Sequence, residues 1–385
     1  MKKNVCFLMD SIFSFGGVQR VTAVIAKELT KTCNVTIVTM DKPSSMNMTF
    51  YGLNEADIHY RFFSYPDTPR WKGLLCKLYS YLYRKVLPQT QLTSAWYAHS
   101  SFPSEKRQAL TRELTEGHYD IIIGVHAPLA VRLSTCKEAL NGITLIGWIH
   151  NSYAALFGKG STYIGEEIRK HYEYQLAMLH HTVVLCDYDA RQYHFPTRVI
   201  HNPLTLQPGE PSQGTSKKFL AVGRFSFLHK GFDLLIKAFQ LFSENNKEWT
   251  LDIVGEGPEE SMYRQLIADY GLGDRIHIHP FTNNIQQYYS DAQVYVLSSR
   301  WEGFGLVLVE AMAHGLPIIS SDLPTSREIM GDYGLYFENG NIHQLATRME
   351  EATQLDWPSK SAEAISISQR FNIENIISKW KEIVR

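Results

Sequence analysis

The sequence predicts an α/β protein built from two Rossmann-like domains, because short apolar runs alternate with longer amphipathic stretches along the whole chain. Its length of 385 residues suits two domains at the usual ~100–200 residues per domain. A segment rich in Pro, Gly, Ser and Thr, residues 201–218, separates two series of such runs. We therefore expect a first domain over 1–200, a linker over 201–218 and a second domain over 219–363, with a cleft between the domains.

The first series opens with the apolar run 4–10, a glycine-containing loop and a helix over about 18–30. Later strands of the same parallel sheet are expected at 34–40, 121–126, 144–150 and 182–186. The stretch 61–112 breaks this rhythm, so we expect a helical insertion there.

The second series is expected to contain a helix over 232–242 and strands at 218–224, 250–257, 275–281, 292–299 and 316–322. In the last stretch of the chain, apolar residues recur at helical spacing from Ile365 to Ile383. This pattern predicts a helix over 364–385, which we expect to cross back to the first domain.

The composition restricts the class of protein. A hydrophobic content of 44% with 20% charged residues excludes a disordered chain. The formal net charge is −1, which provides no basic field, so no nucleic-acid partner is expected. The charge is uneven, because residues 1–200 hold 22 Lys and Arg against 16 Asp and Glu. Either the first half faces something anionic or these are scattered solvated charges.

The sequence predicts a cytoplasmic protein. No apolar run reaches the ~18–20 residues needed to span a bilayer. Asp10 interrupts the first apolar stretch too early for a signal peptide. The cysteines are odd in number and lack metal-ligand spacing, which indicates reduced thiols. They are Cys6, Cys33, Cys76, Cys136 and Cys186.

The strongest candidate site begins directly after the fourth strand of the second series, where ligands bind in open α/β sheets. Glu302 and Glu310 are separated by seven residues, and Gly303 and Gly305 follow the first of them. A helix beginning near Phe304 would offer free backbone N–H groups to a phosphate, and the carboxylates suit sugar hydroxyls. The alternative is a capped helix with two solvent-exposed carboxylates.

Arg224 and Lys230 form a second candidate group, after the first strand of the second domain. Two cations six residues apart can bracket a diphosphate by charge-assisted hydrogen bonds. Either residue alone is more often a surface cation. Together with the glutamate segment they describe a nucleotide-diphosphate site that needs no metal, so no cofactor is expected.

The loop after the first strand contains Gly16 and Gly17. The chain lacks the patterns G-x-G-x-x-G at this loop and G-x-x-x-x-G-K-[ST] anywhere. This argues against a dehydrogenase and a P-loop NTPase. Any tight strand-to-helix turn can need glycine, so the loop alone assigns no function.

Further candidates stand at the ends of predicted strands. His126 and His150 each follow an apolar run, where a structural and a functional role are both open. No H-E-x-x-H set supports a metal site. The strand-to-loop junctions near Gly255 and at 277–284 suit a nucleobase edge, or they are plain turns.

These residues resemble the family 4 retaining glycosyltransferases, which have the GT-B fold and transfer a sugar from a nucleotide donor. The resemblance covers the whole chain but is dense only in residues 219–330. The shared elements are FGG (15–17), His150, VGR (222–224), Lys230, VGEGP (254–258), the Glu-x7-Glu segment (302–310), HGLP (314–317) and SSD (320–322).

The resemblance implies a role for each matching residue. Arg224 and Lys230 would hold the donor diphosphate, and Glu310 would bind the ribose hydroxyls. Glu302 would contact the donor sugar, whose hydroxyls also meet His150. The remaining implied donor contacts are Gly16, Gly17, Gly255, Phe281, Thr282, Gly303, Phe304, Gly305, Leu306 and Val307.

The sequence departs from the family pattern at two points. PTSRE (324–328) has Ser326 where a glycine is common, so no role is assigned to Glu328, and QR (19–20) stands where ER is commoner. The family keeps the anomeric configuration and needs no metal. No clearly placed carboxylate serves as a covalent nucleophile, in contrast to the retaining hydrolases. We therefore expect front-face displacement, with the two cations and the helix N-terminus stabilising the departing diphosphate.

A basic and aromatic segment over 70–87 has no acidic residue, and its apolar residues recur at helical spacing. This pattern is typical of a helix at an anionic membrane surface or beside a lipid-linked acceptor. The alternative is a helix that packs on the first domain with a solvated basic face. The candidates for the acceptor or membrane side are His126, Arg70, Lys72, Lys77, Arg84 and Lys85.

Sequence and resemblance together predict a transferase that moves a hexose or N-acetylhexosamine from a nucleotide-diphosphate sugar to a glycan or lipid-linked glycan. The family favours a UDP-sugar donor and bacterial surface polysaccharide, such as lipopolysaccharide or capsule, as the product. We expect it in the cytoplasm, with a peripheral position on the inner membrane face if the 70–87 helix docks there. The alternatives are a sugar-nucleotide epimerase or phosphorylase on the same fold, and a non-catalytic sugar-nucleotide-binding protein.

Overall fold

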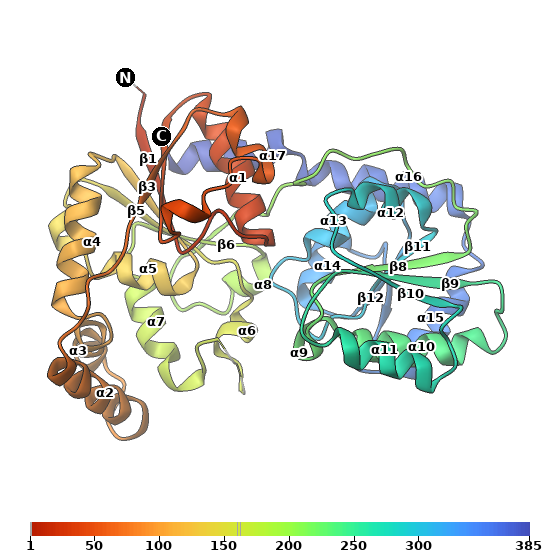
Figure 1. Ribbon diagram of the computed structural model, residues 1–385. Helices are drawn as coiled ribbons and strands as arrows, with labels where there is room; N and C mark the ends of the chain where they lie inside the picture. Colours follow the sequence, from red (N-terminus) through yellow and green to blue (C-terminus); the bar gives the residue numbers. More distant parts are fainter. Residues whose placement is uncertain (1, 160, 162) are drawn as a thin grey trace. The chain divides into compact units, whose positions relative to one another are not determined.

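The computed structural model describes residues 2–159, 161 and 163–385. The chain forms two compact units, residues 1–202 with 374–385 (the N-terminal unit) and residues 203–373 (the C-terminal unit). Each unit contains one parallel β-sheet with helices packed against it (Figure 1). This confirms the predicted α/β class with two Rossmann-like domains. Within the described ranges, no helix combines the length and apolarity that crossing a bilayer requires.

The N-terminal unit has a seven-stranded sheet in the order β3-β2-β1-β4-β5-β6-β7. The chain first builds outward from β1 to β3 and then places β4 on the other side of β1. The topological switch point therefore lies between β1 and β4, where open α/β sheets bind ligands. The strands are β1 (Asn4–Met9), β2 (Asn34–Thr39), β3 (Ile58–Phe62), β4 (Ile121–Val125), β5 (Thr144–Trp148), β6 (His181–Val184) and β7 (Arg198–Val199).

Most helices of the N-terminal unit connect these parallel strands. They are α1 (Gly17–Thr30), α2 (Arg70–Lys85), α3 (Gln91–Ser101), α4 (Ser104–Glu116), α5 (Ala127–Ser134), α6 (Tyr153–Phe157), α7 (Arg169–Leu176) and α8 (Asp187–Ala190). Short 3₁₀ segments occur at η1 (Pro43–Ser45), η2 (Phe50–Glu55), η3 (Lys137–Leu140) and η4 (Glu166–Ile168).

The C-terminal unit has a six-stranded sheet in the order β10-β9-β8-β11-β12-β13. Its switch point lies between β8 and β11, because the chain leaves β8 toward β10 and returns on the other side. The strands are β8 (Lys218–Val222), β9 (Thr250–Val254), β10 (Ile276–His279), β11 (Val294–Leu297), β12 (Ile318–Ser321) and β13 (Leu335–Phe337). The helices are α9 (Phe227–Lys230), α10 (Phe232–Ser243), α11 (Glu260–Asp269), α12 (Ile285–Asp291), α13 (Leu306–Ala313), α14 (Pro324–Met330), α15 (Ile342–Ala352) and α16 (Trp357–Ser368).

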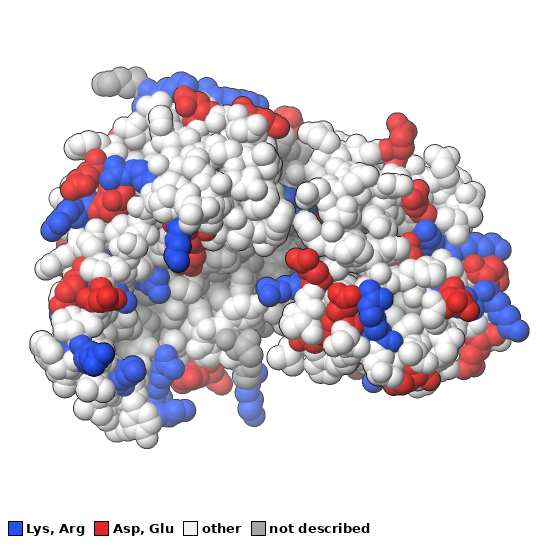
Figure 2. Space-filling view, viewed as in Figure 1, with Lys and Arg blue, Asp and Glu red and all other residues white. Residues whose placement is uncertain are grey.

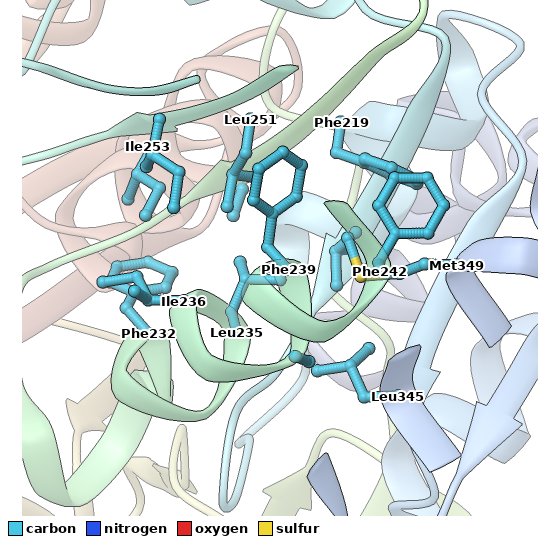
Figure 3. Close-up of a cluster of buried hydrophobic side chains, with 14 of the residues drawn as sticks. Phe219, Phe232, Leu235, Ile236, Phe239, Phe242, Leu251, Ile253, Leu345 and Met349 are labelled. Carbon is cyan, nitrogen blue, oxygen red and sulfur yellow. The ribbon is translucent and has the colours of Figure 1, made fainter. Parts of the chain in front are cut away.

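The core of the C-terminal unit explains why residues 232–243 form a helix at this place. Apolar side chains at i, i+3, i+4 and i+7 spacing lie on one face of α10 and pack against β8 and β9 (Figure 3). α15 covers the same cluster with Leu345 and Met349. The α10 side chains in the cluster are Phe232, Leu235, Ile236, Ala238, Phe239 and Phe242.

The predicted helical insertion at 61–112 is wrong at its start. Residues 61 and 62 end β3, a strand that the sequence analysis missed. β3 is an edge strand, and only Ile58 of its five residues is buried, so it lacks the apolar run of a central strand. The helical part consists of α2, α3 and α4, and α4 extends beyond 112.

The segment expected as a linker, 201–218, belongs to the C-terminal unit from Pro203 onward. The backbone N–H of Gly209 donates to His314 Nε2 at 3.1 Å, and the N–H of Ser212 donates to His314 O at 3.0 Å. Lys218 already belongs to β8. These contacts hold the middle of the segment against the C-terminal unit.

The helix predicted over 364–385 is divided in two. α16 ends at Ser368, a 3₁₀ segment covers Gln369–Phe371, and α17 (Ile373–Ile383) follows. Phe371 is fully buried against Phe304 with ring centroids 5.7 Å apart, which ties this turn to the C-terminal unit. α17 then belongs to the N-terminal unit, as the expected crossing predicts.

α17 is fixed to the N-terminal unit by Trp380, which is fully buried and packs edge-on against Trp148 of β5 at 4.7 Å. We predict that Trp380→Ala destabilises this unit by about 3–5 kcal/mol, because it removes a large aromatic side chain and leaves a cavity. Hydrogen exchange by mass spectrometry should show faster exchange in the β4 and β5 peptides and little change in β8 and β9. Lys379→Ala, at an exposed neighbouring position, is the control, and equal exchange in both variants would contradict the prediction.

Candidate functional site

The loops that follow β8 and β11 meet at the switch point of the C-terminal sheet. The β8 loop carries Arg224 and ends in α9 with Lys230. The β11 loop runs through Glu302 to α13. Because β8 and β11 are paired neighbours, these two loops start side by side, and the structure brings Lys230 and Glu302 together.

Lys230 is positioned by the turn between α9 and α10. Gly231 has φ +63°, and a Cβ at this position would lie 2.1 Å from Ser298 O, so no side chain fits. Ser298 Oγ donates a hydrogen bond to Lys230 O at 2.9 Å, and the Arg300 N–H donates to His229 O at 2.7 Å. The β8 and β11 loops are therefore joined along their backbones.

Glu302 is buried and forms an ion pair with Lys230, with 2.7 Å between Nζ and Oε1. Ser299 Oγ also donates to Oε1 at 2.7 Å, and His229 Nε2 lies 3.6 Å from the same oxygen. Burial alone would raise the pKa of Glu302, but the Lys230 ammonium and His229 outweigh it and hold the pKa well below its usual range. Glu302 is therefore an anion at neutral pH, and its contacts with Lys230, Ser299 and His229 are all made by Oε1.

Two further contacts brace this pair. The rings of His229 and Trp301 stack with centroids 3.8 Å apart and planes 7° from parallel. The Arg300 guanidinium makes a two-pronged ion pair with Asp233 of α10, at 3.0 and 2.8 Å. His229, Trp301 and Asp233 were not singled out in the sequence, although His229 and Trp301 adjoin the predicted residues.

Arg224 lies on the same β8 loop, and its side chain is exposed. It makes no ion pair with any residue that the structure describes. Gly255 follows β9, and a Cβ there would lie 1.9 Å from Gly223 O, so the β9 loop touches the backbone just before Arg224. Glycine is required at this close approach, which fits the predicted junction.

The α13 helix begins after Gly303, Phe304 and Gly305, and Leu306 and Val307 form its first turn. The N–H groups of a first helical turn have no intrahelical acceptor and favour an anion. Phe304 is buried against Phe371, so it anchors the turn.

Glu310 lies about one turn along α13, and it is buried. Tyr289 of α12 donates its hydroxyl to Glu310 Oε2 at 2.9 Å. His314 stacks on Tyr289 and hydrogen-bonds Glu310 O at 2.7 Å. The alternative of two solvent-exposed carboxylates is thus wrong, since Glu302 and Glu310 are both buried and held by partners.

The remaining predicted positions lie at neighbouring strand ends. Phe281 is exposed after β10, and the hydroxyl of Thr282 accepts a hydrogen bond from the Asn284 N–H at 3.0 Å. Glu328 lies on α14, beyond β12, and is half-buried. Ser326, which stands in place of the common glycine, is fully buried on the same helix.

In the N-terminal unit, the Gly16–Gly17 loop follows β1 and begins α1 at the switch point. The Gly16 N–H donates to the Tyr51 hydroxyl at 2.9 Å, and that hydroxyl donates to Ser14 O at 2.9 Å. Asp41, directly after β2, accepts hydrogen bonds from the N–H groups of Ile12 and Phe13. The sequence analysis missed both Tyr51 and Asp41, although an acid directly after a strand was a usable signal for Asp41.

His126 and His150 follow β4 and β5 and lie together, with ring centroids 5.4 Å apart. His126 has φ +75°, which is strained for a residue with a Cβ. His150 is buried beside Trp148, and its Nε2 has no hydrogen-bond partner among the described residues. Burial lowers the pKa of His150 well below its usual range, and His126 lowers it further.

The six acceptor- or membrane-side candidates do not form one group. The Lys72 ammonium donates hydrogen bonds to Glu105 Oε1 and Ser104 Oγ of α4, both at 2.7 Å. Arg84 donates to the Tyr97 hydroxyl at 3.2 Å. Arg70, Lys77 and Lys85 are exposed on α2, whereas His126 follows the central strand β4 and precedes α5.

Comparison with solved structures identifies the fold. TarM is similar over 100% of this chain and 99% of its own, with a TM-score of 0.75 and 14% identity. HepE from Anabaena in complex with UDP gives a TM-score of 0.74 at 18% identity, over 100% and 99% of the two chains. The lipopolysaccharide outer core galactosyltransferase WaaB gives 0.67 at 18% identity over 99% of each chain. The fold is therefore the GT-B fold.

Sequence comparison finds relatives that are similar to the C-terminal unit. Residues 205–370 match the family model of glycosyl transferases group 1. An uncharacterized glycosyltransferase of Haemophilus influenzae is 33% identical over 194 residues, which are 48% of this chain and 54% of the relative. The GtfA subunit of the UDP-N-acetylglucosamine–peptide N-acetylglucosaminyltransferase of Streptococcus pneumoniae is 30% identical over 189 residues, 46% and 37% of the two chains. The chain spans about half or less of the length of these curated relatives.

We predict that His150 takes up no proton between about pH 8 and about pH 5.5, because its lowered pKa keeps the buried imidazole neutral over this range. Histidine-labelled protein observed by NMR should show ring resonances of His150 that do not move across this range. The resonances are assigned by their loss in His150→Gln. A titration with a midpoint near 6.5 would contradict the prediction.

Proposed function

We propose that this protein is a retaining glycosyltransferase that moves a hexose or N-acetylhexosamine from a UDP-sugar to a glycan or lipid-linked glycan acceptor. The observation that carries the proposal is the buried Lys230–Glu302 ion pair at the β8–β11 switch point, next to the α13 N-terminus. A cation, a helix N-terminus and a buried carboxylate provide donors for a diphosphate and an acceptor for sugar hydroxyls.

The proposed reaction is a front-face displacement. The bond between the sugar C1 and the diphosphate oxygen breaks, and a bond from C1 to the acceptor oxygen forms on the same face. The proton of the acceptor hydroxyl passes to the departing phosphate oxygen. Arg224, Lys230 and the first-turn N–H groups of α13 stabilise the charge that develops on the diphosphate, so no metal is required.

We assign Glu302 to the donor sugar and Glu310 to the ribose, as the family resemblance implies. Glu302 Oε1 accepts hydrogen bonds from Lys230 and Ser299, and we propose that its other oxygen, Oε2, accepts one from a sugar hydroxyl. His150 is neutral, so it orients a hydroxyl and does not act as a strong base. Phe281 and Thr282 are proposed near the base, and the Gly16–Gly17 loop near the donor.

The names of relatives support a UDP-sugar donor and a polymer acceptor. One matched relative is a poly(ribitol-phosphate) alpha-N-acetylglucosaminyltransferase of Staphylococcus aureus, and another is the amylovoran biosynthesis glycosyltransferase AmsD of Erwinia amylovora. HepE was solved with UDP-glucose. We therefore propose a role in bacterial surface-polysaccharide synthesis on the cytoplasmic side.

The donor is tested by a thermal-shift screen against UDP, GDP, ADP and their sugar conjugates, all in EDTA. A ligand that binds only the folded state raises its stability by RT ln(1 + [L]/Kd). We predict a shift with UDP and a UDP-sugar that EDTA does not remove, and retention of the α-configuration in the product by NMR. A shift that appears only with added divalent metal, or an inverted product, would contradict the proposal.

We predict that Arg224→Ala lowers kcat/KM by about 100-fold, because it removes one cation from the developing diphosphate charge. Arg224 is exposed, so the variant should fold normally. Arg264→Ala on α11 is the matched control, since it removes an exposed arginine that pairs with Glu260 of the same helix. If the two variants were equally active, Arg224 would not be a ligand of the donor diphosphate.

A further inference from the structure

Helix α2 of the N-terminal unit exposes an apolar face that nothing in the described chain covers. Five large side chains of this helix are between 57% and 68% exposed. At about 100° per residue they fall within a sector of about 120° on the helix. They are Trp71, Leu74, Leu75, Leu78 and Tyr81.

The opposite side of α2 is fixed to the protein, so the apolar face stays turned outward. Tyr83 is fully buried and stacks on Tyr97 of α3, with centroids 4.4 Å apart and planes 21° from parallel. The Tyr79 hydroxyl donates to Thr93 O at 3.1 Å. α3 adds two exposed apolar side chains one turn apart, Leu92 and Trp96.

The charges beside this face indicate what covers it. Arg70, Lys77 and Arg84 recur every seventh residue, so they lie along one edge of the apolar sector. Residues 70–103 contain five Lys and Arg and no Asp or Glu. Blue side chains stand among white ones over α2 and α3 in Figure 2. The covering surface is therefore anionic.

The composition of the face favours a lipid surface over a protein partner. Lys85 projects from within the apolar sector at the end of α2 and is exposed, whereas the cores of protein interfaces are depleted of lysine. At a bilayer a lysine can extend past buried apolar side chains to the headgroups. Trp and Tyr are enriched at the same depth.

We propose that the outward face of α2, with Leu92 and Trp96 of α3, docks the protein on an anionic lipid bilayer. The apolar side chains enter the boundary between headgroups and acyl chains, and the cations along the edge contact lipid phosphates. The inference goes beyond the proposed transferase, and its test measures binding alone. If the protein did not bind vesicles, the transferase proposal would therefore be unaffected. If it showed no transferase activity, the docking proposal would likewise be unaffected.

The test is co-sedimentation of the full chain with vesicles of equal parts phosphatidylglycerol and phosphatidylcholine. We expect binding to these vesicles, weaker binding as salt is raised, and little binding to pure phosphatidylcholine. Binding that does not depend on anionic lipid, or none to either vesicle, would overturn the proposal.

Two pairs of substitutions separate the apolar and the charged contributions. Leu74→Glu with Leu78→Glu should lower the partition coefficient at least about tenfold, because it removes apolar burial and adds repulsion. Arg70→Gln with Lys77→Gln should lower it by roughly fivefold per cation, about 25-fold in all. All four positions are exposed, so folding should be retained.

Leu228→Glu and Lys247→Gln are the matched controls, because both residues are exposed but lie on the C-terminal unit. Each should bind like the parent protein. A loss in the controls equal to that in the α2 variants would overturn the proposal. So would sedimentation velocity showing a dimer that the leucine variants dissociate while vesicle binding is unchanged, because a second copy would then be the occupant.

Discussion

The ion pair between Lys230 and Glu302 is the constraint on which the rest of the C-terminal site depends. A buried ion pair contributes little net stability, because desolvation offsets most of the attraction, yet loss of one partner costs about 3–5 kcal/mol. This pair is nevertheless supported by Ser299, by the His229–Trp301 stack and by the Arg300–Asp233 bridge. The pair itself adds little net stability. The surrounding contacts therefore indicate that the two charges are kept for their position in the site and not for stability alone.

The sheet topology determines where this pair occurs. After β8 and after β11 the chain turns toward opposite sides of the sheet. The loops that follow these two neighbouring strands therefore lie side by side at the same edge of the sheet. The N-terminal sheet repeats the arrangement at β1 and β4, where the Gly16–Gly17 loop and His126 lie. Hydrogen bonds from backbone N–H groups of this loop to Tyr51 and to Asp41 hold it in place. In each unit, the order in which the strands pair thus determines where the candidate loop begins.

The apolar runs and glycine-rich loops were sufficient to predict five strands of each sheet, the α10 helix and the C-terminal crossing, but not β3, β7 and β13, which lie at sheet edges. Physical reasons explain several of the misses. β3 is an edge strand without an apolar run, the turn at Phe371 depends on its burial against Phe304, and the 203–217 segment depends on His314. In the site, Lys230, Glu302, Glu310 and Gly255 were predicted because they follow strands in the sequence. Tyr289 and Tyr51 were missed because only tertiary packing brings them to Glu310 and to the Gly16–Gly17 loop, whereas the position of Asp41 after a strand was a signal that the sequence analysis did not use.

The most direct test of this account measures the affinities for UDP and uridine by calorimetry. If the diphosphate takes the Lys230 ammonium, Glu302→Gln should bind UDP about three- to tenfold more tightly, because a competing buried anion is removed. The neutral double variant Lys230→Met/Glu302→Gln, which leaves no buried unpaired charge, should bind UDP at least about tenfold more weakly than the parent. Uridine, which lacks the phosphates, should bind all three proteins alike. If the single and double variants bind UDP equally, or if uridine binding falls in parallel with UDP, then Lys230 is not a diphosphate ligand and the account is wrong.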